Sequence, residues 1–125
     1  MTYKAISGTV AFCNLVNREV YEGKETDWYT LTLTLDEQGC DKLAVDNVKT
    51  KQYQDSYQRK FKTKTPAKVL DLDNHVIALE KEIPRGSKVN VLYSVSKKPH
   101  PIYGCSVYIQ SVRLVEEAQL YVDGF

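Results

Sequence analysis

The stretch WYTLTLTL, residues 28–35, decides the fold. Leu31, Leu33 and Leu35 alternate with threonines along it, and this period of two residues is typical of a β-strand with one buried face. The leucines predict the buried face, so Trp28 and the threonines are expected to point outward. A tryptophan on the polar side of such a strand is unusual, which makes Trp28 a candidate contact residue.

Other β-prone stretches flank this strand, namely KAISGTVAFCNLV (residues 4–16), KVNVLYSV (residues 88–95) and GCSVYIQSVRLV (residues 104–115). Each contains apolar residues at alternate positions, which predicts one buried face per strand. The predicted inward residues are Ile6, Val10 and Phe12 in the first stretch, Val89, Val91, Tyr93 and Val95 in the second, and Val107 and Ile109 in the third.

About five strands, short connections and one short helical pattern over residues 36–50 predict a mainly all-β domain. Strand-rich chains of this size close into sandwiches or small barrels. The strand count fits best a five-stranded OB-fold barrel with one short helix in a connection. We expect the barrel domain to span residues 1–115 and a short acidic C-terminal tail, which ends in phenylalanine, to span residues 116–125.

Composition and motifs argue against several functional classes. The chain has no run of about 18 apolar residues and no signal-peptide layout at its start, so we expect no membrane contact and a cytoplasmic location. Its three cysteines lie far apart without a CxxC pair, which predicts reduced thiols and no metal site. No catalytic or cofactor motif surrounds His75 or His100, so neither enzyme activity nor a cofactor is expected. Asp71 and Asp73 are interpreted as turn caps.

Charge is strongly segregated, although the net charge of the 125 residues is only +1. Residues 42–68 carry a net charge of +6 and residues 85–113 carry +5, whereas the three remaining segments carry −4, −3 and −3. A single basic block is interpreted as ordinary surface scatter. Two such blocks on one face of the fold would instead form the electrostatic footprint of a protein that binds a polyanion.

Aromatic residues interleave with the bases of both blocks. In KQYQDSYQRKFKTK, residues 51–64, Tyr53, Tyr57 and Phe61 recur every four residues. This combination is typical of single-stranded nucleic-acid binding, because cations pair with phosphates and flat rings stack on bases. Alternatively, the three rings form the buried face of a strand and the bases serve only solubility. The predicted binding residues are Trp28, Lys51, Tyr53, Tyr57, Arg59, Lys60, Phe61, Lys62, Lys64, Lys97, Lys98, Tyr103 and Tyr108.

The chain resembles the single-stranded DNA-binding proteins of short-tailed bacteriophages, a replication family built on an OB fold. The resemblance rests on ISGTVAFCNL, on GKETDWYTLTLTLD, and on IPRGSKVNVLYSVS followed by a lysine- and proline-rich loop and YGCSVYIQSVRLVE. It implies sequence-nonspecific binding of single-stranded DNA during phage replication, recombination and repair in the host cytoplasm. The resemblance implies that the residues in contact with DNA are Trp28, Tyr57, Arg59, Phe61, Lys62 and Tyr108.

That family also tends to end in an acidic tail closed by an aromatic residue. Glu116, Glu117, Asp123 and Phe125 take that place here, in a tail that is much shorter. The resemblance implies that the tail contacts replication proteins and that two copies pair as a homodimer. Two other functions stay open on sequence alone. One is an RNA-binding OB module, because stacking does not read the sugar. The other is a structural or adaptor β-barrel of phage assembly, whose basic blocks would lie on opposite faces.

Overall fold

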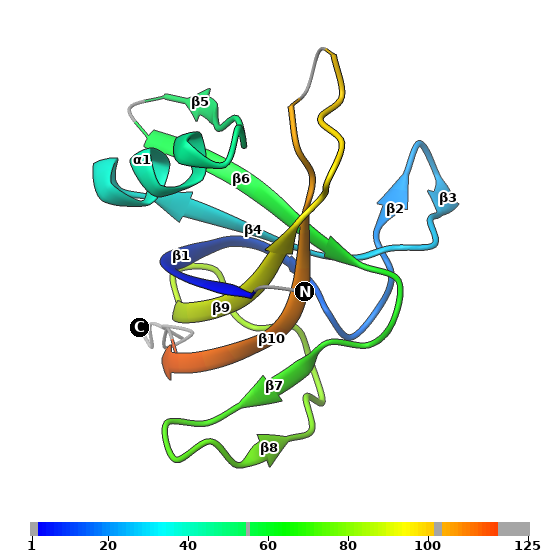
Figure 1. Ribbon diagram of the computed structural model, residues 1–125. Helices are drawn as coiled ribbons and strands as arrows, with labels where there is room; N and C mark the ends of the chain where they lie inside the picture. The colour runs from blue at the N-terminus through cyan, green and yellow to red at the C-terminus, as the bar shows by residue number, and fades with distance from the viewer. Residues whose placement is uncertain (1–2, 55, 102–103, 118–125) are drawn as a thin grey trace.

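A computed structural model describes residues 3–54, 56–101 and 104–117 (Figure 1). Strands dominate it, and the longer ones wind around a common core. No helix in these ranges is long and apolar enough to cross a membrane. The elements are β1 (Lys4–Asn14), β2 (Val20–Tyr21), β3 (Lys24–Glu25), β4 (Tyr29–Leu35), α1 (Glu37–Val45), β5 (Lys51–Tyr53), β6 (Ser56–Thr63), β7 (Lys68–Leu70), β8 (Val76–Ile77), β9 (Lys88–Val95) and β10 (Val107–Glu116).

Five long strands form the barrel in the order β6-β4-β1-β9-β10. Neighbouring strands in this order pair antiparallel. The circle closes where β10 pairs in parallel with β6, through the pair of Tyr108 and Lys62. The prediction of a five-stranded OB-fold barrel with one helix in a connection is therefore confirmed. The helix α1 lies between the second and third barrel strands, within the predicted range.

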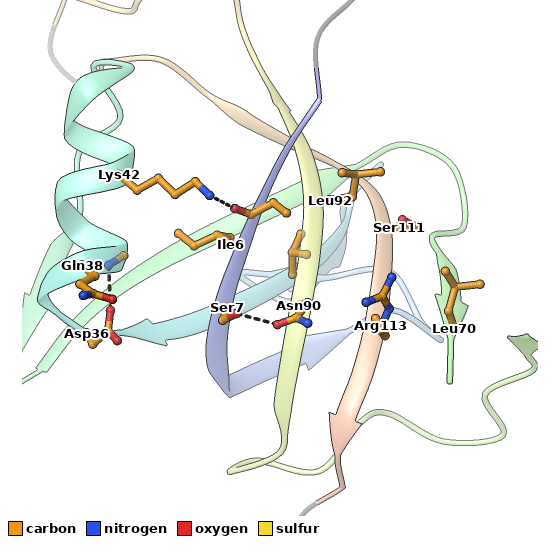
Figure 2. Close-up of a pocket in the computed structure, with 13 residues that line it drawn as sticks. Ile6, Ser7, Asp36, Gln38, Lys42, Leu70, Asn90, Leu92, Ser111 and Arg113 are labelled. Atoms are coloured by element: carbon orange, nitrogen blue, oxygen red, sulfur yellow. Dashed lines mark hydrogen bonds between the residues drawn. The ribbon is translucent and has the colours of Figure 1, made fainter. Parts of the chain in front are cut away.

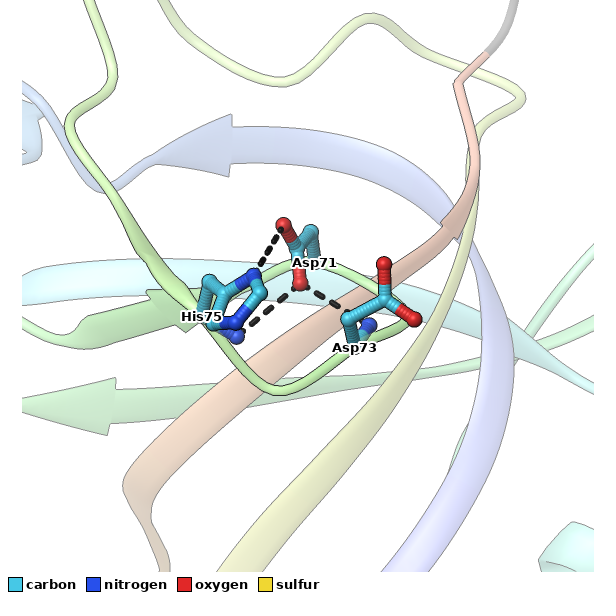
Figure 3. Close-up of side chains that lie close together, drawn as sticks. All are labelled: Asp71, Asp73 and His75. Carbon is cyan, nitrogen blue, oxygen red and sulfur yellow. Dashed lines mark hydrogen bonds and ion pairs between the residues drawn. The ribbon is translucent and has the colours of Figure 1, made fainter.

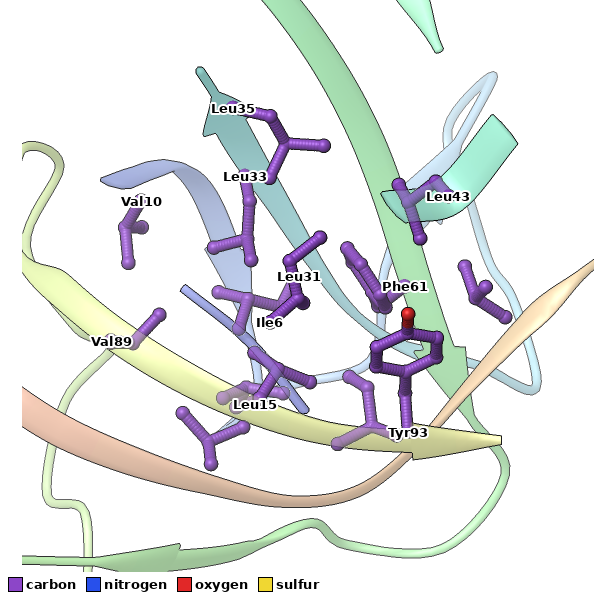
Figure 4. Close-up of a cluster of buried hydrophobic side chains, with 14 of the residues drawn as sticks. Ile6, Val10, Leu15, Leu31, Leu33, Leu35, Leu43, Phe61, Val89 and Tyr93 are labelled. Carbon is purple, nitrogen blue, oxygen red and sulfur yellow. The ribbon is translucent and has the colours of Figure 1, made fainter. Parts of the chain in front are cut away.

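The barrel interior is filled by the alternating apolar residues of its strands (Figure 4). Leu31 and Leu33 of β4 are fully buried, as the threonine–leucine alternation predicts. The ring of Tyr93 from β9 meets that of Phe61 from β6 edge to face, with ring centroids 5.5 Å apart. Gly8 allows β1 to approach β4 closely, because a Cβ atom there would lie 3.0 Å from the Cβ of Leu33.

Phe61 belongs to this core, so its predicted role as a base-stacking residue is wrong. Phe61 pairs with Leu31 of β4 and is completely buried. Tyr57 and Phe61 do share one face of β6, as their spacing predicts, but this face is the inward one because it opposes Leu35 and Leu31 of β4. Tyr53 lies in β5, across the hairpin turn that contains Gln54 with a φ of 55°. Tyr57 has the same facing as Phe61, yet it lies at the start of β6 and stays 43% exposed.

Phe12 is also placed differently from the prediction, which put it in the core. The pairing of β1 with β4 shifts between Val10 and Phe12, so Ala11 is an extra residue in β1. Such a β-bulge reverses the alternation that follows it. Val10 and Ala11 are buried, and Phe12 points outward with 58% of its surface exposed.

Helix α1 covers the barrel beside the end of β4. Its N-cap residue Asp36 accepts a hydrogen bond from the amide of Gly39 at 2.7 Å, which satisfies one free amide of the first turn. Gly39 packs against Leu35, where a Cβ atom would lie 3.3 Å from that side chain's own Cβ. Leu43 of the helix and Val48, which follows the helix, are both buried in the core.

Replacement of Phe61 by alanine should destabilise the fold strongly. Removal of a fully buried phenylalanine leaves a cavity beside Tyr93, and such changes lower the free energy of unfolding by about 3–5 kcal/mol. Urea unfolding followed by circular dichroism measures the loss. The control is Tyr21→Ala, which removes a ring that is 65% exposed and should change the free energy by no more than about 0.5 kcal/mol. Equal effects of the two substitutions would contradict this assignment.

Candidate nucleic-acid interface

The outer wall of the barrel carries a row of side chains that crosses four strands. Asn14 of β1 pairs with Thr30 of β4, Thr30 pairs with Lys62 of β6, and Lys62 pairs with Tyr108 of β10. Directly paired residues share one face of a sheet, so these four positions form a continuous line across the wall. A second outward row, two residues along the strands, contains Phe12, Thr32 and Lys60.

Two rings and two ammonium groups gather at the β10 end of the first row. The rings of Trp28 and Tyr108 are stacked, with centroids 6.3 Å apart and planes inclined by 25°. The Nζ atom of Lys62 lies 4.5 Å from the Trp28 centroid and 5.8 Å from that of Tyr108, and the Nζ atom of Lys64 lies 5.1 Å from that of Trp28. These are cation–π distances. We call Trp28, Lys62, Lys64 and Tyr108 the aromatic cluster.

Desolvation lowers the pKa of Lys62, and the neighbouring charges of Arg59, Lys60 and Lys64 lower it further. The cations are thus close enough to repel one another. A groove of about 370 Å³ next to them is lined by Lys49, Thr50, Lys51, Gln58, Arg59, Lys60 and Lys62. An anion in this groove would relieve the repulsion, so the positive charge of the wall favours the binding of an anion such as phosphate.

Arg59 has a structural role and also lines the groove, and its contact with phosphate stays a prediction. It pairs with Leu33, so it is on the inward face of β6. Its guanidinium donates to the carbonyl oxygens of Lys49 at 3.0 Å and Cys105 at 3.2 Å. Burial lowers the pKa of Arg59. The side chain therefore ties the β5–β6 region to the segment that precedes β10, and its charge contributes to the groove from within.

One acidic residue lies on the basic wall. Glu19, in the connection from β1 to β4, has its carboxylate 2.8 Å from the Nζ atom of Lys60 and accepts a hydrogen bond from the hydroxyl of Thr30 at 2.9 Å. Its backbone amide donates to the carbonyl of Trp28 at 2.8 Å. Glu19 thus holds the connection that carries Trp28 against the wall, and it partly neutralises Lys60.

Glu82 fixes the beginning of this connection. Its carboxylate accepts hydrogen bonds from the amides of Leu15 and Val16, both at 2.7 Å, and of Asn17 at 3.0 Å. Three consecutive amides that would otherwise lack partners at the end of β1 are satisfied by one side chain. Glu82 therefore sets the direction in which the chain leaves the barrel toward Glu19 and Trp28.

The remaining predicted residues lie around the aromatic cluster or beyond it. The segments that contain the two basic blocks meet where β6 pairs with β10, whereas Arg113 of the second block lines a cavity beside α1. Lys51 is exposed beside the groove, Lys97 and Lys98 are exposed in the β9–β10 connection, and Tyr53 pairs with Ser56 in the β5–β6 hairpin. Glu116 ends β10, opposite Lys88, and Glu117 is exposed. Tyr103, Asp123 and Phe125 lie outside the described residues.

Sequence reasoning missed Phe12, Glu19 and Arg85 on this wall. Phe12 was hidden by a bulge, and alternation alone cannot reveal an inserted residue. Glu19 belongs to the acidic segment 1–41, which the charge count set apart from the bases. Arg85 lies in the turn Pro84-Arg85-Gly86-Ser87. It is far from Phe12 in the sequence, so no local pattern predicts that the two side chains are in contact.

The Asp71–Asp73–His75 group is a capped turn (Figure 3). One Asp71 carboxylate oxygen accepts hydrogen bonds from the amides of Asp73 and His75, both at 2.9 Å, as the turn-cap interpretation predicts. The amide hydrogen bond from His75 is the main cause that lowers the pKa of Asp71. Ligand atoms of the three side chains lie within 4.8 Å of one another, and the turn geometry accounts for their proximity.

Another cavity lies elsewhere on the barrel, and none of the predicted binding residues lines it (Figure 2). It measures about 470 Å³ and lies between α1 and the strands β1, β9 and β10. Ser7 donates to Asn90 across its floor at 2.6 Å, and Lys42 donates to the carbonyl of Ala5. Lys42 and Arg113 are its basic residues, and its lining includes no aromatic ring.

The thiol of Cys13 is poorly suited to nucleophilic chemistry. Burial raises the pKa of this thiol to about 11, so it stays protonated at neutral pH.

Comparison with solved structures finds the same fold in phage proteins. The single-stranded DNA-binding protein of bacteriophage Enc34 in complex with ssDNA superposes with a TM-score of 0.72 at 11% identity, over 94% of this chain and 88% of that one. Gp2.5, a single-stranded DNA-binding protein encoded by bacteriophage T7, gives a TM-score of 0.66 at 16% identity, over 100% of this chain and 97% of that one. No family model and no curated protein matches the sequence.

Glu82→Ala should loosen the connection that carries Trp28. Three amides lose a charged acceptor, and hydrogen bonds to charged groups contribute about 1.5–3 kcal/mol each to stability. We expect a lower free energy of unfolding and faster hydrogen exchange at residues 15–17. Glu80→Ala, which removes an exposed carboxylate from the same loop, is the control and should change neither quantity. Unchanged exchange at residues 15–17 in Glu82→Ala would contradict the anchoring role.

Proposed function

We propose that this protein binds single-stranded DNA without sequence preference and coats it during phage replication, recombination and repair in the host cytoplasm. The observation that carries the proposal is the aromatic cluster beside the cationic groove. The cluster lies over the second and third strands of an OB barrel and the adjoining part of β10. Oligonucleotides bind to this face of OB folds, between the first and the last connections of the barrel.

The chemistry of the wall suits a strand of nucleotides. Bases stack on Trp28 and Tyr108, and this contact is tolerant of sequence because every base has a flat π-face. The ammonium groups of Lys62 and Lys64, now above the Trp28 ring, move to the phosphates as a base takes their place. Each phosphate relieves the repulsion that lowers the pKa of Lys62, so binding favours the charged form of this side chain.

Two further observations support this function over a purely structural barrel. Lys62 of the first basic block lies beside Tyr108, which belongs to the segment of the second block, and a structural barrel does not require this arrangement. The phage proteins with the same fold are single-stranded DNA-binding proteins by name, and one of them was solved with ssDNA. Contact of the C-terminal tail with replication proteins and pairing of two copies stay predictions.

Addition of oligothymidylate should quench the emission of Trp28, the sole tryptophan. Tyr108→Ala should weaken binding by about 1–3 kcal/mol, the contribution of one stacked base, and leave its salt dependence unchanged. Lys62→Gln should reduce the slope of log affinity against log salt by about 0.7, the value for one phosphate of a single strand. Fluorescence titrations at several salt concentrations measure both effects.

Lys68→Gln is the control for these titrations, because it removes the same charge from an exposed position on β7. It should leave the salt slope close to that of the wild type. A wild-type protein that neither loses Trp28 emission nor retards oligothymidylate in a gel at low salt would disprove the proposed function.

Glu19→Gln should strengthen binding by roughly 2- to 5-fold. The carboxylate competes with phosphate for Lys60, and partly exposed ion pairs contribute about 0.2–1 kcal/mol. Because Lys60 then becomes available to the strand, the salt slope should also steepen by up to about 0.7. Glu25→Gln neutralises an exposed carboxylate of the same connection and is the matched control. A Glu19→Gln variant that binds no better than Glu25→Gln would contradict the competition.

A further inference from the structure

Phe12 is an exposed aromatic ring whose position the core does not require. It follows the β1 bulge, and 58% of its surface is exposed although Val10 and Ala11 beside it are buried. Without the extra residue, the alternation of β1 would place this ring inside the barrel. Bulges often redirect a side chain beside a binding site. The sheet geometry therefore presents Phe12 to the outside at a specific place.

The turn that precedes β9 places a cation over this ring. Residues 84–87 form a tight turn closed by a hydrogen bond from the Ser87 amide to the Pro84 carbonyl, and Gly86 has a φ of 93°. The third position of a type II turn requires such a positive φ, which glycine adopts without strain. Arg85 therefore lies at the exposed corner of the turn, with its guanidinium carbon 5.8 Å from the centroid of the Phe12 ring.

Backbone hydrogen bonds hold the turn against β1. The amide of Gly86 donates to the carbonyl of Val10 at 2.8 Å, and the amide of Val10 donates to the carbonyl of Ser87 at 2.8 Å. Val10 makes both bonds and directly precedes the inserted residue Ala11, so the turn that carries Arg85 is fixed next to the bulge that turns Phe12 outward. The ring and the guanidinium form one preformed unit, which we call the Phe12–Arg85 pair.

The Phe12–Arg85 pair is continuous with the proposed interface. Phe12 shares an outward row with Thr32 and Lys60, and this row runs beside the row that ends at Tyr108. Three strand spacings and two residues separate Phe12 from Tyr108, which corresponds to a distance on the order of 15 Å along the wall. Small threonines of β4 lie between them, and Thr30 is buried next to the Glu19 carboxylate to which it donates a hydrogen bond, so the path crosses Glu19.

We propose that the Phe12–Arg85 pair is a second base-stacking position for the strand that contacts Trp28 and Tyr108. The inference rests on the proposed function and extends the path of the strand across β4 to β1. A nucleobase stacks on the exposed face of Phe12, and Arg85 moves from the ring to the adjoining phosphate. Charge complementarity favours this occupant over an apolar partner protein, because Arg85 lies over the ring and Lys60 lies in the same outward row, two strands away.

Two stacking positions on one strand give a dependence on strand length. We would titrate the wild type and Phe12→Ala with oligothymidylates of about 2 to about 16 nucleotides, because the shortest cannot reach both positions and the longest match the OB-fold site sizes. Both proteins should bind the shortest strand equally through the aromatic cluster. On the longest strand Phe12→Ala should bind roughly 5- to 100-fold more weakly, the loss expected for one stacked base. Leu72→Ala, which removes an exposed apolar side chain between β7 and β8, should match the wild type at every length.

A direct optical test uses Phe12→Trp in a Trp28→Phe background, in which the new indole is the sole one. Its emission should be quenched by the long strand and not by the shortest strand. Arg85→Gln should reduce the salt slope on the long strand only, by about 0.7. Thermal unfolding checks that each variant is folded, and alteration of an exposed side chain should leave the midpoint nearly unchanged.

The outcomes separate this inference from the proposed function. If the wild type binds oligothymidylate with quenching of Trp28, but Phe12→Ala binds every length as the wild type does, the second stacking position is wrong and the proposed function stands. An equal loss at all lengths would also overturn it, as would an unquenched indole at position 12. If Phe12→Ala instead abolishes self-association seen by light scattering and leaves the titrations unchanged, the ring is a contact between two copies. A wild type that binds no strand disproves both proposals.

Discussion

The parallel contact between β6 and β10 is the constraint on which the rest of the molecule depends. It closes the barrel through the pair of Lys62 and Tyr108, and the segments that it joins come from the two basic blocks of the sequence. Arg59 reinforces the seam from the inside by its hydrogen bond to the carbonyl of Cys105. Because Trp28 stacks on Tyr108, the aromatic cluster exists only when this closure is made. Closure of the core and assembly of the candidate interface are therefore one structural event.

Much of the fold was predictable because strand alternation is a local property. Leu31 and Leu33 of β4 and Tyr93 of β9 are buried as their two-residue period predicts. The departures have causes that are not local. Phe12 is turned outward by one extra residue in β1, and Phe61 is buried because the pairing of β6 with β4 places it opposite Leu31. A period of two survives only as long as no bulge interrupts it, and it does not tell which face of a strand the neighbouring strands bury.

The candidate site was predictable in composition but not in arrangement. The charge count identified both basic blocks, yet it gave no means to separate Lys62, which stands over two rings, from Arg59, whose guanidinium is bonded to backbone carbonyls. It also could not place Glu19 among the bases. Within the described residues, the positive character of the wall results from three-dimensional pairing: Lys60 is partly neutralised by Glu19, whereas Lys62 and Lys64 face the rings. The net charge of a segment does not carry this information.

The threonines of β4 link the core to the shape of the wall. The leucines of TLTLTL fill the barrel, so the threonines between them must form the outer surface of the same strand. Their small side chains lie between Lys60 and Lys62 of β6 on one side and Phe12 of β1 on the other. This gives a low floor bordered by rings and cations, which suits an extended polymer better than the larger cavity beside α1. The alternation that determines the fold thus also determines the shape of the wall. A shift of one residue in β4 would disrupt both the core and the wall.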